Sequence, residues 1–160
     1  MQELGLKLAT KKSRPDVSIL SKDGRSVLLS ANVEASCASI AKVSAKDAEA
    51  YREYRAFVDK ISGFVLGLLN DIPPDLTNIG GKQLWELAKK GIALKRLGKK
   101  TMMEFLKVAP MSVADFLNER FETQFIKAGI AAPALYGSYT GPWSSYTTIN
   151  LLMWECTAQE

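Results

Sequence analysis

Residues 44–74 read SAKDAEAYREYRAFVDKISGFVLGLLNDIPP, and this stretch predicts one long amphipathic helix. Ser44 is a typical helix N-cap, and Asp47 three positions later is a carboxylate version of the capping box. Apolar residues then recur in steps of three and four, which places them on one helix face: Tyr51, Tyr54, Val58, Ile61, Val65 and Leu68. The sequence Asp-Ile-Pro-Pro at 71–74 ends the pattern, because proline does not continue a helix.

Upstream of this helix, the sequence predicts a β-hairpin. Two apolar runs, at 17–20 and 26–30, flank the turn sequence Lys-Asp-Gly-Arg at 22–25. Gly24 accepts the positive φ that such a turn requires. Alternating apolar residues nearer the N-terminus predict a third strand: Leu4, Leu6 and Leu8. A sheet of this size leaves one face open, so another layer must cover it.

Capping and stop signals divide the rest of the chain into further helices. Asn32 caps a short helix that ends near residue 43, and a helix over 82–97 ends at Gly98. Thr101 opens a capping box for a short helix that Pro110 terminates. Three more helices are expected, after Ser112, from Thr123 to about Leu135, and over 145–156.

These elements predict an α+β fold dominated by helices, with a helix content of roughly 60%. A small antiparallel β-hairpin sheet is followed by about six helices. We expect a single domain over residues 1–160, in which 1–31 form the sheet and 32–160 form a helical cap.

Composition excludes several classes of protein. The chain has 160 residues, of which 47% are hydrophobic and 24% are charged, and its net charge is +4. These values are typical of an ordered globular domain and exclude a disordered or collagen-like chain. No apolar run approaches the ~18 residues of a membrane span, and residues 1–10 lack the apolar core of a signal peptide.

The usual catalytic and cofactor motifs are absent from the sequence. Histidine does not occur, and Cys37 and Cys156 lie outside any CxxC motif, so they are interpreted as reduced, buried thiols of a cytoplasmic protein. No GxGxxG follows a strand, and neither GxxxxGK[ST] nor GxSxG occurs. We therefore predict no catalytic residue, no cofactor-binding residue and no metal ligand, and this chain alone does not look like a complete enzyme.

The segment 82–107 concentrates the positive charge of the chain. It holds eight basic and two acidic residues, a net charge of +6, interleaved with apolar side chains. A basic amphipathic helix of this kind can be a solvated surface helix, can lie at a membrane surface or can bind an acidic partner. Nucleic acid is a further option, but no recognised binding motif supports it. The residues predicted to make a membrane or partner contact are Lys82, Trp85, Lys89, Lys90, Lys95 and Arg96.

The segment 136–146, YGSYTGPWSSY, contains four aromatic residues, two glycines and one proline. Glycines let a backbone approach a ligand closely, and aromatic rings line apolar pockets. The segment is either an aromatic connector between two helices or the wall of a pocket. Tyr139, Trp143 and Tyr146 are the predicted substrate-binding residues, whereas Met153 and Trp154 are interpreted as core.

Several short motifs, in this order, resemble the middle part of the phytoene-desaturase-like FAD-dependent oxidoreductases. The nearest branch comprises the phytoene-dehydrogenase-related and pyridine nucleotide-disulfide oxidoreductase domain proteins. The motifs cover nearly the whole chain: RPD at 14–16, DGR at 23–25, ASIA at 38–41, SAKDAEAY at 44–51, MSVADFL at 111–117, FET at 121–123 and GP at 141–142.

The resemblance implies a middle region that carries a small antiparallel sheet and a helical cap over an apolar cavity. In such enzymes an N-terminal Rossmann-like segment binds FAD and a C-terminal segment completes the flavin site. This sequence lacks both motifs, so the resemblance implies a fragment of a larger flavoenzyme, with FAD in the intact parent and none bound to this chain. Its implied partners are an apolar small-molecule substrate and the remaining flavin-binding segments, without nucleic acid.

Two hypotheses follow for the function. The first is a substrate-binding or cap region of an FAD-dependent dehydrogenase or desaturase that acts on an apolar substrate and is not catalytic alone. In it, the basic segment 82–107 makes peripheral contact with a membrane from which the substrate enters. The alternative is a stand-alone helical binding module for a protein partner or a membrane surface.

Overall fold

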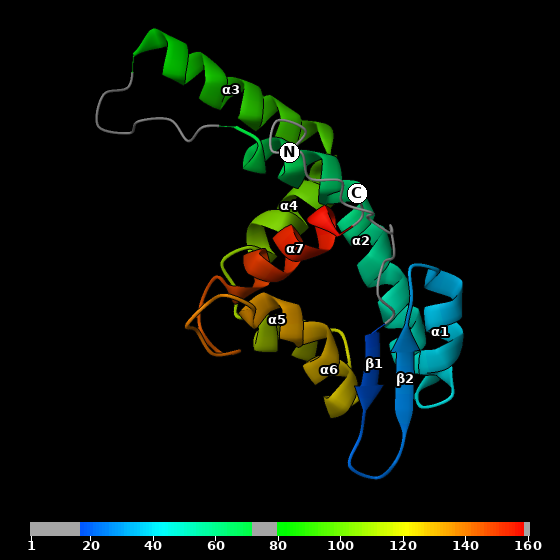
Figure 1. Ribbon diagram of the computed structural model, residues 1–160. Helices are drawn as coiled ribbons and strands as arrows, with labels where there is room; N and C mark the ends of the chain where they lie inside the picture. Colours follow the sequence, from blue (N-terminus) through cyan, green and yellow to red (C-terminus); the bar gives the residue numbers. More distant parts are fainter. Residues whose placement is uncertain (1–16, 72–79, 159–160) are drawn as a thin grey trace, which may run out of the picture.

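The computed structural model describes residues 17–71 and 80–158 (Figure 1). Within these residues the chain is 66% helical, with seven α-helices and one two-stranded antiparallel sheet, so the predicted α+β class is confirmed. The elements in chain order are β1 (Val17–Leu20), β2 (Ser26–Leu29), α1 (Val33–Ala41), α2 (Ala45–Leu69), α3 (Gly81–Arg96), α4 (Lys99–Val108), α5 (Val113–Asn118), α6 (Gln124–Ala131), the 3-10 helix η2 (Ala132–Leu135) and α7 (Thr147–Thr157).

Helix α2 is the long helix that the sequence predicts, and it packs against both α1 and α7 (Figure 1). The Ser44 hydroxyl accepts a hydrogen bond from the Asp47 N–H, as a helix N-cap does. The predicted apolar stripe is buried along the helix, except for Leu68 near its C-terminus. The helix ends at Leu69, just before the Asp-Ile-Pro-Pro sequence.

The core lies between α2 and the helices that follow it. Tyr54 of α2 meets the rings of Phe116 and Phe121 edge-on, at centroid distances of 6.2 and 6.4 Å. Leu151 and Leu152 of α7 are fully buried in the same cluster. The face that α2 buries therefore holds together segments from the middle and the end of the chain.

The hairpin packs its apolar face onto the helices. Ile19 pairs with Val27, and both side chains are buried. Gly24 has a φ of 85°, which confirms the turn that the Asp-Gly pair predicts. A Cβ on Gly129 of α6 would lie 2.3 Å from Ile19 Cδ1, so only glycine permits this approach. The predicted third strand at 4–8 lies outside the described residues.

Serine hydroxyls of α1 accept hydrogen bonds from backbone N–H groups along the outer edge of β2. The Leu28 N–H donates to Ser39 Oγ and the Ser30 N–H donates to Ser36 Oγ, each at 2.9 Å. An edge strand otherwise presents unpaired backbone groups that attract other strands. Helix α1 therefore covers this edge with side chains rather than with another strand.

The prediction that Thr101 caps a helix is wrong. Gly98 has a φ of 85°, and its carbonyl accepts a hydrogen bond from the Met102 N–H, so α4 already begins at Lys99. Thr101 consequently lies inside the first turn. The helix ends at Val108, just before Pro110, as predicted.

The last helix begins two residues later than predicted. Tyr146 precedes it with a φ of 67°, a left-handed conformation that bulky residues rarely adopt, and donates its N–H to the Pro110 carbonyl.

Cys37 and Cys156 are free and buried, as predicted. No described helix has both the length and the hydropathy needed to cross a membrane.

Candidate functional site

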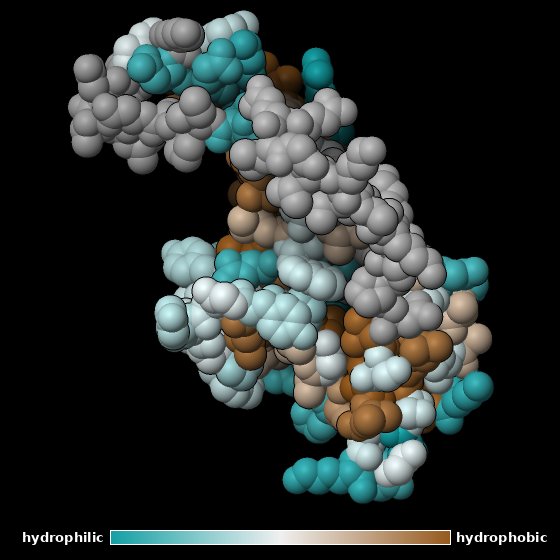
Figure 2. Space-filling view, in the orientation of Figure 1, coloured by the Kyte–Doolittle hydropathy of each residue, from teal (hydrophilic) through white to brown (hydrophobic). Residues whose placement is uncertain are grey.

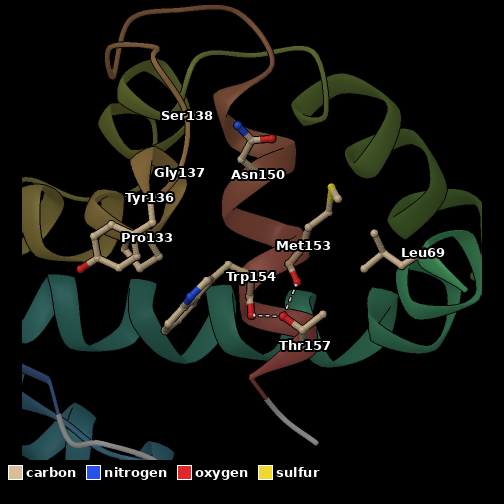
Figure 3. A pocket seen from close by; sticks show the side chains of 9 residues that line it. All are labelled: Leu69, Pro133, Tyr136, Gly137, Ser138, Asn150, Met153, Trp154 and Thr157. Carbon is tan, nitrogen blue, oxygen red and sulfur yellow. Dashed lines mark hydrogen bonds between the residues drawn. The ribbon is translucent and has the colours of Figure 1, made fainter.

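An open hollow of about 410 Å³ lies beside α7 (Figure 3). Helix α7 supplies one wall through side chains spaced three and four residues apart, which therefore share one face of the helix. The end of α2, the 3-10 helix η2 and the start of the 136–146 segment supply the rest. The lining residues are Leu69, Pro133, Tyr136, Gly137, Ser138, Asn150, Met153, Trp154 and Thr157.

The walls of the hollow are mainly apolar, with a few polar groups at the rim. Leu69, Met153 and Trp154 project from the two helices that flank it (Figure 3). Thr157 uses its hydroxyl internally, because Oγ1 lies within 3.1 Å of the Met153 carbonyl and 2.9 Å of the Trp154 carbonyl. Asn150 has no hydrogen-bond partner for its side-chain amide within the described chain, so this amide is available to a ligand.

The chemistry of the lining residues favours binding over catalysis. They include no carboxylate, no lysine, no arginine and no cysteine. Tyr136, Ser138 and Thr157 carry hydroxyls, but no carboxylate, lysine or histidine lines the hollow to act as the general base that activates a hydroxyl nucleophile. The hollow can therefore hold an apolar molecule and orient it through a few polar contacts, as ligand pockets do.

The three predicted substrate-binding residues lie on the 136–146 segment but do not line this hollow. Tyr139, Trp143 and Tyr146 are all exposed, and Tyr139 is the most exposed of the three. The backbone of the segment is anchored from below, because the Ala114 N–H donates to the Pro142 carbonyl at 3.0 Å. The three rings remain exposed, and their role in substrate binding stays a prediction.

Sequence reasoning assigned Met153 and Trp154 to the core, and for Trp154 this is wrong. Helix α7 buries Leu151, Leu152 and Cys156 on one face and turns Trp154 toward the hollow on another. Met153 is half-buried, since it packs on the core and also lines the hollow. The sequence signal for this face is a pair of polar residues, Asn150 and Thr157, which lie seven positions apart. A spacing of seven places them on the same helix face as Met153 and Trp154 between them.

The predicted membrane or partner residues all lie on α3, which stands away from the body of the molecule (Figure 1). Trp85 is exposed, with the Lys89 ammonium 5.9 Å from the centre of its ring. Lys90 turns toward the end of α2, where it pairs with Asp71. Lys95 and Arg96 are exposed and have no partner within the described chain, and nothing is described of the Lys82 side chain.

The described residues do not form the framework that dinucleotide cofactors use. Such cofactors bind where a parallel strand leads through a glycine-rich turn to a helix N-terminus. Here β1 and β2 form an antiparallel hairpin, and the connection from β2 to α1 contains no glycine. No group of metal-binding side chains occurs among the described residues either. The described residues therefore contain no Rossmann-type dinucleotide site.

The described residues thus form a helix-rich fold with an apolar hollow. Over 138 residues the chain is 28% identical to the Pyridine nucleotide-disulfide oxidoreductase domain-containing protein 2 of Mus musculus, a match that covers 81% of this chain and 24% of the mouse protein. The protein of the same name in Rattus norvegicus is 27% identical over 143 residues, which cover 84% of this chain and 25% of the rat protein. This weak homology supports a relation to an oxidoreductase-type family.

The chain spans about a quarter of the length of the curated relatives it matches. No protein-family model matches the sequence. No solved structure matches it either.

Proposed function

We propose that this chain is the substrate-binding or cap region of an FAD-dependent oxidoreductase that acts on an apolar substrate. The observation that carries the proposal is the homology to one quarter of an oxidoreductase-domain protein, combined with an apolar hollow whose lining includes no carboxylate, lysine or cysteine. A region of this kind binds and positions the substrate, whereas the cofactor supplies the redox chemistry. The phytoene-desaturase-like motifs support a lipophilic, polyene-like substrate for the whole enzyme.

In this proposal the hollow beside α7 removes the substrate from water. Leu69, Met153 and Trp154 offer apolar surface, and burying apolar area stabilises a complex by about 25 cal/mol per Å². The Asn150 amide sets the orientation of a ligand that carries one polar end. The flavin is bound by segments of the larger protein that lie outside this chain, and the exposed aromatic rings of 136–146 face those segments.

Retinol, a fluorescent polyene, tests the binding step in the chain itself. We expect saturable energy transfer from tryptophan to retinol, because Trp154 lies in the wall of the hollow. Met153→Gln is expected to raise the Kd of retinol about tenfold, since a polar amide then faces an apolar ligand. Titrations followed by retinol emission measure this.

Met103→Gln is the matched control, because Met103 is exposed on α4 and does not line the hollow. It is expected to leave the Kd of retinol unchanged. Non-saturable transfer, or an equal loss of affinity in both variants, contradicts substrate binding in this hollow.

A further inference from the structure

Helix α3 presents an apolar stripe to solvent rather than to the core. Leu84, Trp85 and Ile92 are 62%, 59% and 48% exposed. Their positions, together with Ala88 between them, place them on one side of the helix. Leu94 and Leu97 on the opposite side pack against the core, which fixes the stripe outward.

Positive charge accompanies this stripe along the helix. Lys95 and Arg96 occupy the last turn without partners in the described chain, and Lys99 and Lys100 follow at once at the start of α4. Lys89 lies over the Trp85 ring and forms an ion pair with Glu86, in which Nζ and Oε1 are 2.9 Å apart. The outward side of α3 is therefore apolar at its centre and cationic at its C-terminal end.

We propose that α3 binds the surface of a bilayer that contains anionic lipids. Leu84, Trp85 and Ile92 enter the boundary between head groups and acyl chains, where tryptophan is favoured. Lys95 and Arg96 meet the lipid phosphates, and this charge complementarity identifies the occupant as an anionic membrane. The inference rests on α3 alone and is independent of the proposed substrate hollow.

Nucleic acid and acidic proteins fit this surface less well. Nucleic acid binding relies on contacts of basic residues with phosphates and leaves an exposed apolar stripe unused. An acidic protein would use the cations of the last turn but would have to cover the apolar stripe with its own apolar residues. A bilayer satisfies both features at once, because its surface is anionic and its acyl boundary is apolar.

The test is partitioning of the full 160-residue chain onto vesicles of phosphatidylcholine with phosphatidylserine. We expect binding with a blue shift of tryptophan emission, weak binding to phosphatidylcholine alone, and loss of binding when about 1 M salt shortens the Debye length to ~3 Å. Trp85→Phe should remove most of the blue shift, because the other two tryptophans, Trp143 and Trp154, lie outside α3. Binding should persist, because phenylalanine keeps an apolar ring at this position.

Two pairs of variants separate the cationic from the apolar contribution. The double variant Lys95→Gln and Arg96→Gln should lower partitioning about thirtyfold, whereas Lys22→Gln with Lys42→Gln removes the same charge far from α3 and should change it less than about twofold. Leu84→Gln should lower partitioning on the order of tenfold, whereas Leu20→Gln, at a leucine that is even more exposed but lies on β1, should not.

Three results overturn the proposal. The first is equal binding to vesicles with and without phosphatidylserine. The second is equal partitioning of the α3 variants and their matched controls, with all of them folded by circular dichroism. The third is tighter binding to RNA or to polyglutamate than to vesicles, without a blue shift of Trp85, which assigns the surface to another class of partner.

Discussion

Asp47 connects two distant parts of the chain through its carboxylate. The residue is fully buried, and its two oxygens accept the Glu122 N–H at 2.8 Å and the Thr123 N–H at 3.0 Å. These N–H groups lie at the start of α6, which has no side-chain cap of its own. The Asp47 carboxylate on α2 therefore caps α6. The capping-box pattern instead predicts that this carboxylate accepts the Ser44 N–H.

The pKa of Asp47 gives this contact a pH dependence. Burial alone would raise it, but the hydrogen bonds from Thr123 and Glu122 outweigh burial and lower the pKa below its usual value. The stabilisation is therefore complete above the unfolded pKa of about 3.9 and is lost as the pH falls through the lower folded pKa. Asp47→Asn should cost about 1–3 kcal/mol at pH 7, because one N–H then faces an amide donor.

Urea unfolding at pH 7 and at steps down to about pH 3 measures both effects. Asp47→Asn should also lose part of the acid dependence of the free energy of unfolding. Glu53→Gln, on the exposed side of the same helix, should change neither quantity noticeably. An Asp47→Asn protein that matches the parent at both pH values would contradict this role.

Helices α2 and α7 are joined by a buried ion pair as well as by apolar packing. The side chains of Arg55 and Glu155 are only 7% and 12% exposed, and they are paired across the two helices. Removing one partner of a buried pair leaves the other charge in a medium that solvates it poorly.

Arg55→Met should therefore cost about 3–5 kcal/mol of unfolding free energy, and adding Glu155→Leu should restore most of it. The measurement is a double-mutant cycle by urea denaturation. The matched comparison is Lys46 and Glu122, a pair that also links distant segments but is 71% and 61% exposed. Lys46→Met should cost less than about 1 kcal/mol. Equal losses of unfolding free energy in Arg55→Met and Lys46→Met would contradict the distinction between the buried and the exposed ion pair.

The described residues form one buried hydrophobic core and also leave several large hydrophobic side chains exposed on the surface. Cys37 and Cys156 come from helices far apart in sequence and are buried in one hydrophobic cluster. By contrast, hydrophobic residues gather over the hairpin at the lower right of Figure 2. Of the hairpin residues, Leu20 and Leu28 are among the exposed large hydrophobic ones. Exposed apolar surfaces of this kind are typical of sites where further protein packs.

The two thiols report on the integrity of the core. Burial raises the pKa of Cys37, and it raises the pKa of Cys156 to about 11, so little thiolate exists at neutral pH. We expect neither thiol to react with a disulfide reagent at pH 7.5 until urea unfolds the chain, after which both react. Rapid reaction of one thiol in the folded chain, identified with Cys37→Ser and Cys156→Ser, would show that part of the core opens separately.

Features that depend on near neighbours were predictable from the sequence. The caps at Ser44 and Ser112 each bond a backbone N–H three residues on, and the Gly24 turn closes within five residues. The stripe on α2 follows from helix periodicity, and burial confirms it. In all these cases the residues that interact are adjacent along the chain, so their order alone predicts the contact.

The candidate site depends on contacts between distant segments. Asp47 caps a helix that begins 77 residues later in the chain, and the Ala114 N–H of α5 bonds the Pro142 carbonyl of the 136–146 segment. Helix α7 has apolar residues on more than one face, so periodicity does not reveal that Trp154 lines the hollow. Local spacing thus predicted most of the helices, the hairpin turn and the basic segment 82–107. Tertiary packing decided which side chains enclose the hollow, because only packing selects the face that each element buries.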